Sequence, residues 1–280
     1  MYRIVYKERL NPTVSMMKID APRVAAKAEA GQFIILRVDA EGERIPLTVA
    51  DYDRDAGTVT VIYQIVGATT KKLDRLEAGE YISDFVGPLG RPTETAGLRR
   101  VAVVGGGVGC AIAYPVAKKL SSLGCEVDSI IGFRNRELVI LEKEFRSVSR
   151  ELRIMTDDGS FGERGLVTDA LRALIEGGRQ YDEVIAIGPL VMMKFVSKLT
   201  REFGIHTVVS MNPIMIDGTG MCGGCRLTVG GEVKFACVDG PEFDGHLVDF
   251  DEAMKRSSMY RDAEHRAMEH VCNLFGEEVR

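Results

Sequence analysis

Three cysteines and one aspartate near the carboxyl end of the chain have the types and spacing that most clearly predict chemistry. Two residues separate Cys222 and Cys225, Cys237 follows them, and Asp217 precedes Cys222 by five positions. Plant-type [2Fe–2S] sites use a Cys-x4-Cys-x2-Cys run plus one more distant cysteine. The three cysteines fit the last three positions of that spacing and Asp217 fits the first. Because a carboxylate is also an anionic iron ligand, we predict that these four residues bind a [2Fe–2S] cluster.

Two other interpretations of the cysteines stay open. Three thiolates and one carboxylate could form a structural zinc site, or the cysteines could be reduced and unconnected in a glycine-rich loop. The remaining cysteines, Cys110, Cys125 and Cys272, are expected to be small apolar residues without a chemical role, as unpaired cysteines commonly are.

The composition narrows the class of protein. The chain has 280 residues, 28% of them charged, and a net charge of −5, so nothing suggests a nucleic-acid partner. Six cysteines, half of them clustered, do not resemble a secreted disulfide framework. The polar amino-terminal residues have no apolar signal core, and no apolar run reaches membrane-spanning length. We therefore expect a cytoplasmic protein with no membrane segment.

Residues 1–97 contain short apolar runs separated by turn residues, which predicts an antiparallel barrel. Only the segment around 69–76 suggests a helix. Two stretches here carry groups that could bind a phosphate. In the first, Arg44-Ile-Pro46-Leu47-Thr48, the arginine offers a forked donor to a pyrophosphate. In the second, Val66-Gly67-Ala-Thr69-Thr70, hydroxyls meet the start of a helix. A strand-end arginine and an ordinary helix cap are the alternatives.

The middle of the chain alternates strands and helices, which predicts a doubly wound parallel sheet. A buried run ending at Val104 leads into Gly105-Gly106-Gly107-Val108-Gly109, and a helix follows over 111–123. Strand, glycine turn and helix together suit a dinucleotide pyrophosphate, although a plain turn is also possible. Strands are expected over 126–133 and 183–187, and further helices over 137–146, 165–175 and 192–203. Residues 226–229 and 232–236 are expected to form a small hairpin, and 238–245 is expected to be a loop.

Two arginines follow the second strand of the predicted parallel sheet, where the adenine ribose of a bound dinucleotide would lie. Arg134 and Arg136 could pair with a 2′-phosphate and favour NADP(H) over NAD(H). Alternatively, they are solvated loop residues.

These motifs resemble those of the ferredoxin–NADP reductase superfamily. Arg44-x-Pro46-Leu47-Thr48 and Gly67-x-Thr69-Thr70 are similar to its two flavin motifs, and Gly-Gly-x-Gly at 105–109 is similar to its nucleotide loop. The resemblance implies that Arg44 contacts the FAD pyrophosphate and that Thr48 lies near the flavin ring. Gly188-Pro189-Leu-Val-Met-Met193 resembles the family's Cys-Gly-Pro-x-x-Met motif beside the nicotinamide, with Ile187 in place of the cysteine.

The order of the segments resembles the electron-transfer subunits of NAD-dependent dihydroorotate dehydrogenases, and more closely the small subunits of NADH-dependent reduced ferredoxin:NADP oxidoreductases. Asp217 carries the distinction, because the former have four cysteines and the latter have Asp plus three. The resemblance implies a flavin barrel (1–97), a nucleotide domain (98–210) and a [2Fe–2S] segment with the tail (211–280).

The resemblance also implies an oxidoreductase with FAD, a [2Fe–2S] cluster and NAD(H) or NADP(H), and electron bifurcation in a complex with a larger flavin and iron–sulfur subunit. Ferredoxin could be reached through that subunit. No protein side chain is expected to act as a catalyst, because the cofactors carry the chemistry. A zinc-stabilised nucleotide-binding adaptor is the non-enzymatic alternative.

Overall fold

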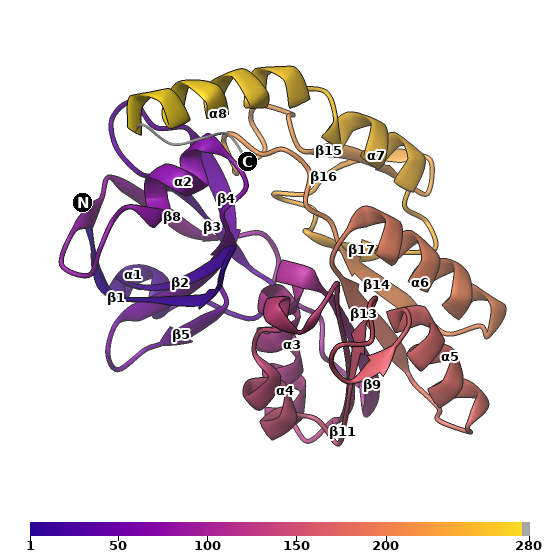
Figure 1. The fold of residues 1–280 in the computed structure, drawn as a ribbon. Coiled ribbons are helices and arrows are strands. Elements are labelled where there is room, and N and C mark those ends of the chain that lie inside the picture. Colours follow the sequence, from indigo (N-terminus) through magenta and orange to yellow (C-terminus); the bar gives the residue numbers. More distant parts are fainter. Residues whose placement is uncertain (276–280) are drawn as a thin grey trace.

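An antiparallel barrel forms the amino-terminal part of the chain (Figure 1). One sheet has the order β5-β6-β2-β1-β7 and the other has the order β4-β3-β8. The strands are β1 (Tyr2–Asn11), β2 (Val14–Asp20), β3 (Phe33–Arg37), β4 (Arg44–Thr48), β5 (Asp51–Asp53), β6 (Thr58–Gln64), β7 (Tyr81–Ile82) and β8 (Asp84–Leu89). Fully buried side chains such as Ile4, Met17 and Leu36 fill the space between the sheets. The computed structural model describes residues 1–275, apart from the side chains of His265 and of residues 270–275.

Two helices belong to the barrel. The expected helix is α2 (Ala68–Asp74), and a second one, α1 (Pro22–Ala25), was not predicted. A single helix was therefore a wrong expectation for this part. Pro22 stands at the first turn of α1, a position that suits proline because its missing N–H needs no partner there.

A seven-stranded sheet forms the second part, in the order β12-β11-β10-β9-β13-β14-β17. Its strands are β9 (Arg100–Gly106), β10 (Glu126–Phe133), β11 (Glu151–Thr156), β12 (Glu163–Arg164), β13 (Glu183–Ile187), β14 (Thr207–Ser210) and β17 (Glu242–Asp244). The first six run parallel, and β17 pairs antiparallel with β14. The doubly wound sheet is thus confirmed, with one antiparallel edge strand added.

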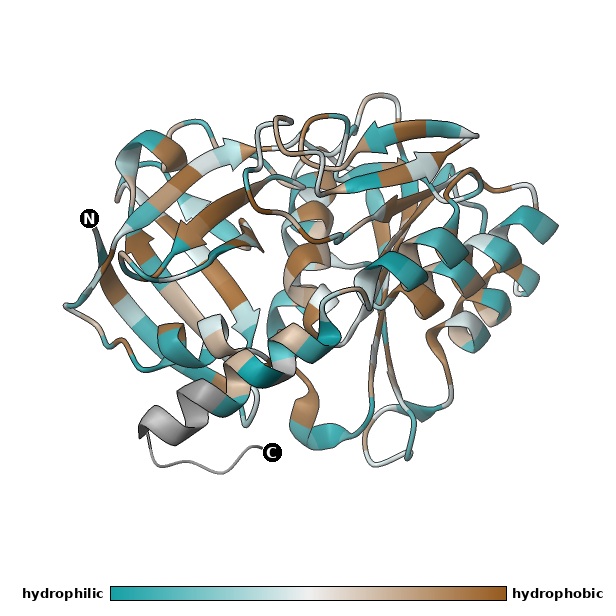
Figure 2. Cartoon of the chain, turned by 90° about the horizontal axis from the view of Figure 1, so that it is seen from above, coloured by the Kyte–Doolittle hydropathy of each residue, from teal (hydrophilic) through white to brown (hydrophobic). Residues whose placement is uncertain are grey.

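Helices cover both faces of this sheet (Figure 1). The apolar faces of α3 (Cys110–Ser122) and α4 (Glu142–Val148) pack on one side, and α5 (Val167–Glu176) and α6 (Leu190–Glu202) pack on the other. Figure 2 shows the hydrophobic residues concentrated on the strands and the hydrophilic residues mostly on helices and loops outside. In the described part of the chain, no helix has the length and apolar character needed to cross a membrane.

The helix expected over 137–146 is divided into a short 3-10 turn, η2 (Arg136–Leu138), and α4. Leu141 precedes α4 with a φ of 58°. A leucine in this left-handed region interrupts a helix, because its Cβ approaches the following carbonyl oxygen. Nothing in the local sequence marks this conformation.

The carboxyl-terminal segment contains the hairpin of β15 (Arg226–Val229) and β16 (Glu232–Phe235), followed by α7 (Phe250–Ser257) and α8 (Arg261–Phe275). The hairpin was predicted, whereas β17 lies in a stretch expected to be a loop. In Figure 1, α8 runs from α7 across to α2 of the barrel. Because β17 joins the parallel sheet, the division at residues 97 and 210 stays a prediction.

The carboxyl group of Glu242 connects the barrel to β17, the edge strand of the seven-stranded sheet. Glu242 on β17 accepts a hydrogen bond of 2.8 Å from the Thr93 hydroxyl in the segment that leaves the barrel. Burial raises the pKa of Glu242 to about 7, the Thr93 bond lowers it in part, and Glu183 raises it further. The protonated form therefore suits the folded state.

We predict that Glu242→Gln stabilises the fold at alkaline pH. The folded pKa of about 7 exceeds the ordinary 4.5, so the wild-type carboxyl is undisturbed below pH 4.5 and costs stability as the pH rises through 7. The variant should gain up to about 3 kcal/mol at pH 8 and almost nothing at pH 4.5. Chemical denaturation at both pH values measures this.

Glu137→Gln is the control, because Glu137 is exposed. Its free energy of unfolding should depend on pH as that of wild type does. Equal effects of Glu242→Gln at both pH values would contradict the prediction.

Candidate functional site

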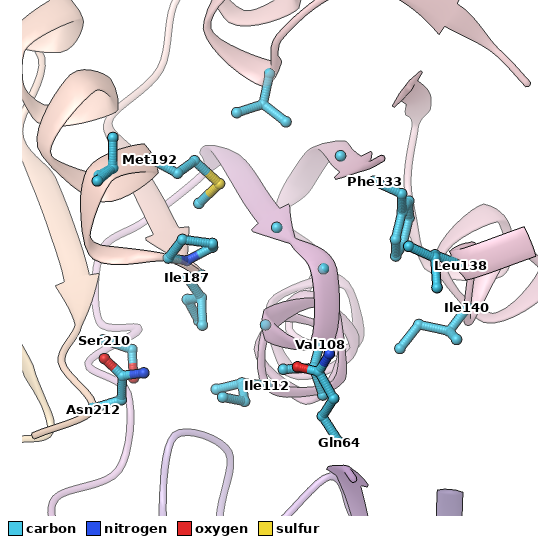
Figure 3. A pocket seen from close by; sticks show the side chains of 18 of the residues that line it. Gln64, Val108, Ile112, Phe133, Leu138, Ile140, Ile187, Met192, Ser210 and Asn212 are labelled. Carbon is cyan, nitrogen blue, oxygen red and sulfur yellow. The ribbon is translucent and has the colours of Figure 1, made fainter. Parts of the chain in front are cut away.

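A cleft of about 1160 Å³ lies between the barrel and the carboxyl ends of the parallel strands. The barrel contributes β4 and the end of β6, the sheet contributes the loops after β9 and β13, and the segment 210–213 closes one side. Figure 3 shows Val108, Ile112 and Ile187 facing this space, with Gln64 on one side and Asn212 on the other. Ligands of doubly wound sheets bind at this end of the strands.

Glycines allow the loops after β9 and β13 to touch. A Cβ on Gly109 would lie 2.5 Å from the Ile187 carbonyl oxygen, and a Cβ on Gly188 would lie 3.1 Å from the Gly106 backbone. A Cβ on Gly106 would meet the Met192 sulfur at 2.5 Å. Two backbones therefore approach at the floor of the cleft, where a flat ring or a pyrophosphate could also approach them closely.

Most of the predicted dinucleotide residues line this cleft. They are Gly106, Gly107, Val108, Gly109, Arg134, Gly188 and Pro189, and from the barrel motif Pro46, Leu47 and Thr48 join them. Gly105 is buried beneath the loop. Met193 is fully buried in the core, and its neighbour Met192 lines the cleft instead. Met193 therefore does not reach the cleft, because consecutive residues of a helix point in different directions.

The other barrel residues lie outside the cleft. Arg44 donates from Nε to the Ile216 carbonyl at 3.0 Å and from a terminal nitrogen to the Asp217 carbonyl at 3.4 Å. The Thr70 hydroxyl accepts from the backbone N–H groups of Val66 and Gly67, both at 3.0 Å. Thr70 therefore closes the first turn of α2.

The second threonine of this motif, Thr69, donates to the Glu43 carboxylate at 3.2 Å. The Thr69 hydroxyl therefore takes no part in closing the first turn of α2. It lies beside Glu43, the residue that precedes Arg44. The two barrel motifs are thus brought near each other, on the side of the barrel that faces residues 216 and 217.

Several polar residues of the cleft were missed in the sequence. Gln64 ends β6, Asn212 follows β14, and Asn11 ends β1. The Asn11 amide donates to the Leu138 carbonyl at 3.1 Å and so connects the barrel to η2, beside the parallel sheet. Polar residues at strand ends are common, so only their shared position in the fold distinguishes these three.

The two arginines after β10 have different surroundings. Arg134 lines the cleft, whereas the Arg136 guanidinium lies 5.4 Å from the centre of the Phe161 ring. Arg134 is therefore at the surface of the cleft, and Arg136 makes a cation–π contact with Phe161.

The four predicted cluster ligands form two pairs within residues 216–238, the candidate cluster loop, which the hairpin of β15 and β16 interrupts. Cys225 and Cys237 are buried neighbours, while Cys222 is exposed and lies near Asp217. Among the described residues, no three His, Cys, Asp or Glu side chains converge as a metal site. The Asp217 carboxylate instead accepts from the Thr219 hydroxyl at 2.6 Å and the Thr219 N–H at 2.8 Å.

The electrostatics of the two pairs differ. The backbone N–H of Gly224, 3.5 Å from the Cys222 sulfur, lowers the pKa of that thiol, and the Asp217 N–H lowers it further. Burial and the neighbouring Cys225 raise the pKa of Cys237 to about 12. Cys222 therefore ionises more readily than Cys237. This suits a metal ligand, because the thiolate is the form that binds a metal.

The donor set suits a thiolate-bound iron cluster. Three thiols and one carboxylate share a loop in which Gly218, Gly220 and Gly223 have positive φ, so backbone N–H groups can point toward sulfur. Of the other cysteines, Cys110 is buried and the Cys125 sulfur lies 2.9 Å from the Leu98 carbonyl oxygen. The Cys272 side chain is outside the described residues.

One known family matches the segment that contains the candidate cluster loop, and several known proteins resemble most of the chain. The family "Iron-sulfur cluster binding domain of dihydroorotate dehydrogenase B" matches residues 212–249. A Thermotoga maritima protein named "Dihydroorotate dehydrogenase B (NAD(+)), electron transfer subunit homolog" is 46% identical, covering 98% of this chain and 96% of the relative. The electron transfer subunit of Fusobacterium nucleatum is 32% identical over 81% of this chain and 89% of its own.

Solved structures agree at the level of the fold. One, described as "Insights into flavin-based electron bifurcation via the NADH-dependent reduced ferredoxin-NADP oxidoreductase structure", has a TM-score of 0.92 and 44% identity, covering 96% of this chain and 97% of the other. The Amycolatopsis cytochrome P450 reductase GcoB has a TM-score of 0.60 and 20% identity, covering 72% of this chain and 65% of its own. The latter shows a shared fold alone.

We predict that Gly109→Ala weakens both the fold and nucleotide binding. The new Cβ would lie 2.5 Å from the Ile187 carbonyl oxygen and 2.7 Å from the Gly188 Cα. Because both are backbone atoms, the two loops must separate, at a cost of about 1–3 kcal/mol. Thermal unfolding and titration with NADH and NADPH measure the two effects, and we expect at least about tenfold weaker binding.

Gly124 at the other end of α3 gives the matched control. A Cβ on Gly124 would have no neighbouring atom within 4 Å, and the φ of +85° at this residue suits asparagine. Gly124→Asn should therefore behave as wild type. If Gly109→Ala also showed wild-type stability and nucleotide binding, the contact of Gly109 with the Ile187–Gly188 backbone would not be important.

Proposed function

The chain belongs to the family of dihydroorotate dehydrogenase B electron-transfer subunits and their homologues, and from this membership we propose that it relays electrons between a nicotinamide dinucleotide and a partner subunit. It is a subunit of a flavin and iron–sulfur oxidoreductase of the ferredoxin reductase type, with FAD, a [2Fe–2S] cluster and NAD(P)H as cofactors. When bound, the flavin converts hydride transfer into single-electron transfer, and the cluster carries single electrons.

One observation supports this relay most strongly. Met211, Asn212 and Pro213 line the large cleft and also a second cavity of about 310 Å³, and Cys222 lines that second cavity. A single stretch of backbone therefore separates the candidate flavin and nicotinamide cleft from the candidate cluster loop. A short separation of this kind is what a relay between two cofactors requires.

The residues of the cleft have distinct proposed roles. Pro46, Leu47 and Thr48 would face the flavin ring, and the loop 105–109 would hold the dinucleotide pyrophosphate at the start of α3. The thirteen-residue α3 helix presents its amino end there, where N–H groups and the helix dipole favour an anion.

At the far end of the dinucleotide, Arg134 would meet the adenine ribose and any 2′-phosphate on it. Gly188, Pro189 and Met192 would lie beside the nicotinamide, and by its contact with Gly106 this second loop would keep the ring against the flavin. Arg44, Val66, Gly67, Thr69 and Thr70 would bind the FAD phosphates.

Asp217 favours a particular member of the family. We propose that Asp217, Cys222, Cys225 and Cys237 bind the cluster, and that the chain is the small subunit of a cytoplasmic, electron-bifurcating ferredoxin:NADP transhydrogenase. Its partner would be a larger flavin and iron–sulfur subunit, through which ferredoxin is reached. The names of several relatives support the second candidate, a dihydroorotate dehydrogenase subunit.

Mass spectrometry of the native complex, purified anaerobically from its source, tests the proposal. We expect a larger flavin and iron–sulfur subunit, together with FAD and two irons on this chain. Recovery with a dihydroorotate-oxidising subunit would favour the second candidate. Zinc without flavin would overturn both in favour of a nucleotide-binding adaptor.

We predict that Asp217→Cys retains the cluster and changes its reduction potential by an amount on the order of 100 mV, because ligand type and charge set that potential. A redox titration followed by electron paramagnetic resonance (EPR) measures the change. Asp251→Cys adds a thiol on exposed α7 and should have no effect. An unchanged potential in Asp217→Cys would show that Asp217 is not a ligand.

A further inference from the structure

Four arginines donate hydrogen bonds to backbone carbonyls of the candidate cluster loop. Arg44 bonds the carbonyls of residues 216 and 217, and Arg91 donates from Nε to the Val238 carbonyl at 3.1 Å. Arg226 and Arg256 bond the carbonyls of Gly223 and Gly224 at 3.5 and 3.2 Å. Each acceptor lies within two residues of a candidate ligand.

Two of these arginines come from the barrel and hold opposite ends of the ligand set. Arg44, on β4, bonds the backbone at Asp217, the first candidate ligand. Arg91, just after β8, bonds the residue that follows Cys237, the last candidate ligand. The Arg91 N–H also donates to the Gly240 carbonyl at 2.7 Å. Both ends of the candidate cluster loop are therefore fixed to the barrel.

The loop also packs directly on the barrel between these two points. A Cβ on Gly218 would lie 2.7 Å from an Ile35 side-chain carbon and 3.0 Å from a Leu89 side-chain carbon. The φ of Gly218 is +82°. The position therefore favours glycine, both for space and for backbone conformation, and the loop is held close to the β4-β3-β8 sheet, which carries Arg44.

The positive charges of Arg91 and Arg44 beside the cluster loop are neutralised to different extents. Asp239 lies 4.0 Å from the Arg91 guanidinium and offsets it in part, while its carboxylate also accepts from the Phe235 N–H at 2.8 Å. In the contacts described for Arg44, the acceptors are uncharged carbonyls. Positive charge is thus directed at the loop from the barrel side.

We propose that Arg44 and Arg91 are positioning residues that hold the two ends of the cluster loop on the barrel and raise the reduction potential of the cluster. The proposal rests on the proposed function, because it needs a cluster on this loop. A [2Fe–2S] cluster held by this loop would take up one electron from the flavin on reduction and would so gain one negative charge. Nearby guanidinium groups stabilise that added charge.

Arg44 would then have two partners. The family resemblance assigns it to the FAD pyrophosphate, and the structure bonds it to the cluster loop. One guanidinium can serve both, because its five N–H donors point in several directions. FAD binding and the shape of the cluster loop would therefore be coupled through this residue.

Arg91→Gln gives the cleanest test, because Arg91 belongs to no proposed cofactor contact. We expect unchanged iron and flavin content and a three- to tenfold smaller equilibrium constant for one-electron reduction, where about tenfold corresponds to about 59 mV. The side chain is 70% exposed, so solvent limits the effect. A redox titration followed by EPR measures the potential without any turnover.

Two control variants accompany it. Arg54→Gln removes an arginine whose hydrogen bond, 3.1 Å to the Ala28 carbonyl, stays within the barrel, and its potential should match wild type. Arg91→Lys keeps the charge and should restore at least half of the shift. An Arg91→Gln potential equal to wild type, or an equal drop in Arg54→Gln, would overturn the proposal for Arg91.

Arg44→Gln separates the two roles of Arg44. We expect it to lower the FAD content and, after flavin is restored, still to lower the cluster potential. Loss of flavin with a wild-type potential would overturn the cluster role of Arg44. If wild-type protein carries no iron, the proposed function fails instead, and that result differs from every outcome of these variants.

Discussion

Close approach of backbone segments at glycines is the constraint on which this structure depends. Gly109 lies against the Ile187 carbonyl, Gly106 lies against Gly188, and Gly218 lies on Ile35 of the barrel. A Cβ on Gly109 would overlap backbone atoms, and a Cβ at the other two places would displace side chains, so glycine allows the closest approach at each. These contacts bring the cleft, the barrel and the cysteine loop together, which side chains alone could not do.

The carboxyl-terminal segment binds the two larger parts to each other. It leaves the sheet at β14, forms one wall of the cleft at 210–213, and lies on the barrel at Gly218. It then returns to the sheet as β17, where Glu242 bonds Thr93. A segment that touches both parts can hold a cofactor near each of them. The candidate cluster loop is therefore an integral part of the fold.

The sequence predicted the elements that burial dictates and missed those that depend on distant partners. The strands 126–133 and 183–187 were predicted with the bounds that the structure has, because short segments rich in β-branched and other apolar residues, bounded by turn residues and alternating with helices, indicate buried strands. The strand β17 is short and polar, and only its neighbour β14 makes it a strand. The cysteine spacing identified a loop but not its two pairs. It was not visible in the sequence that Met192 lines the cleft while Met193 is buried, because the face that a helix turns to the core depends on its packing.

The central claim is that the cleft and the cysteine loop form one route for electrons. The most direct test adds NADH to the anaerobically purified wild-type chain and records the EPR spectrum together with the visible spectrum. The account predicts that the flavin absorbance bleaches and that the signal of a reduced [2Fe–2S] cluster appears, at up to one spin per chain. Bleached flavin without such a signal, in protein shown to contain two irons, would contradict the route.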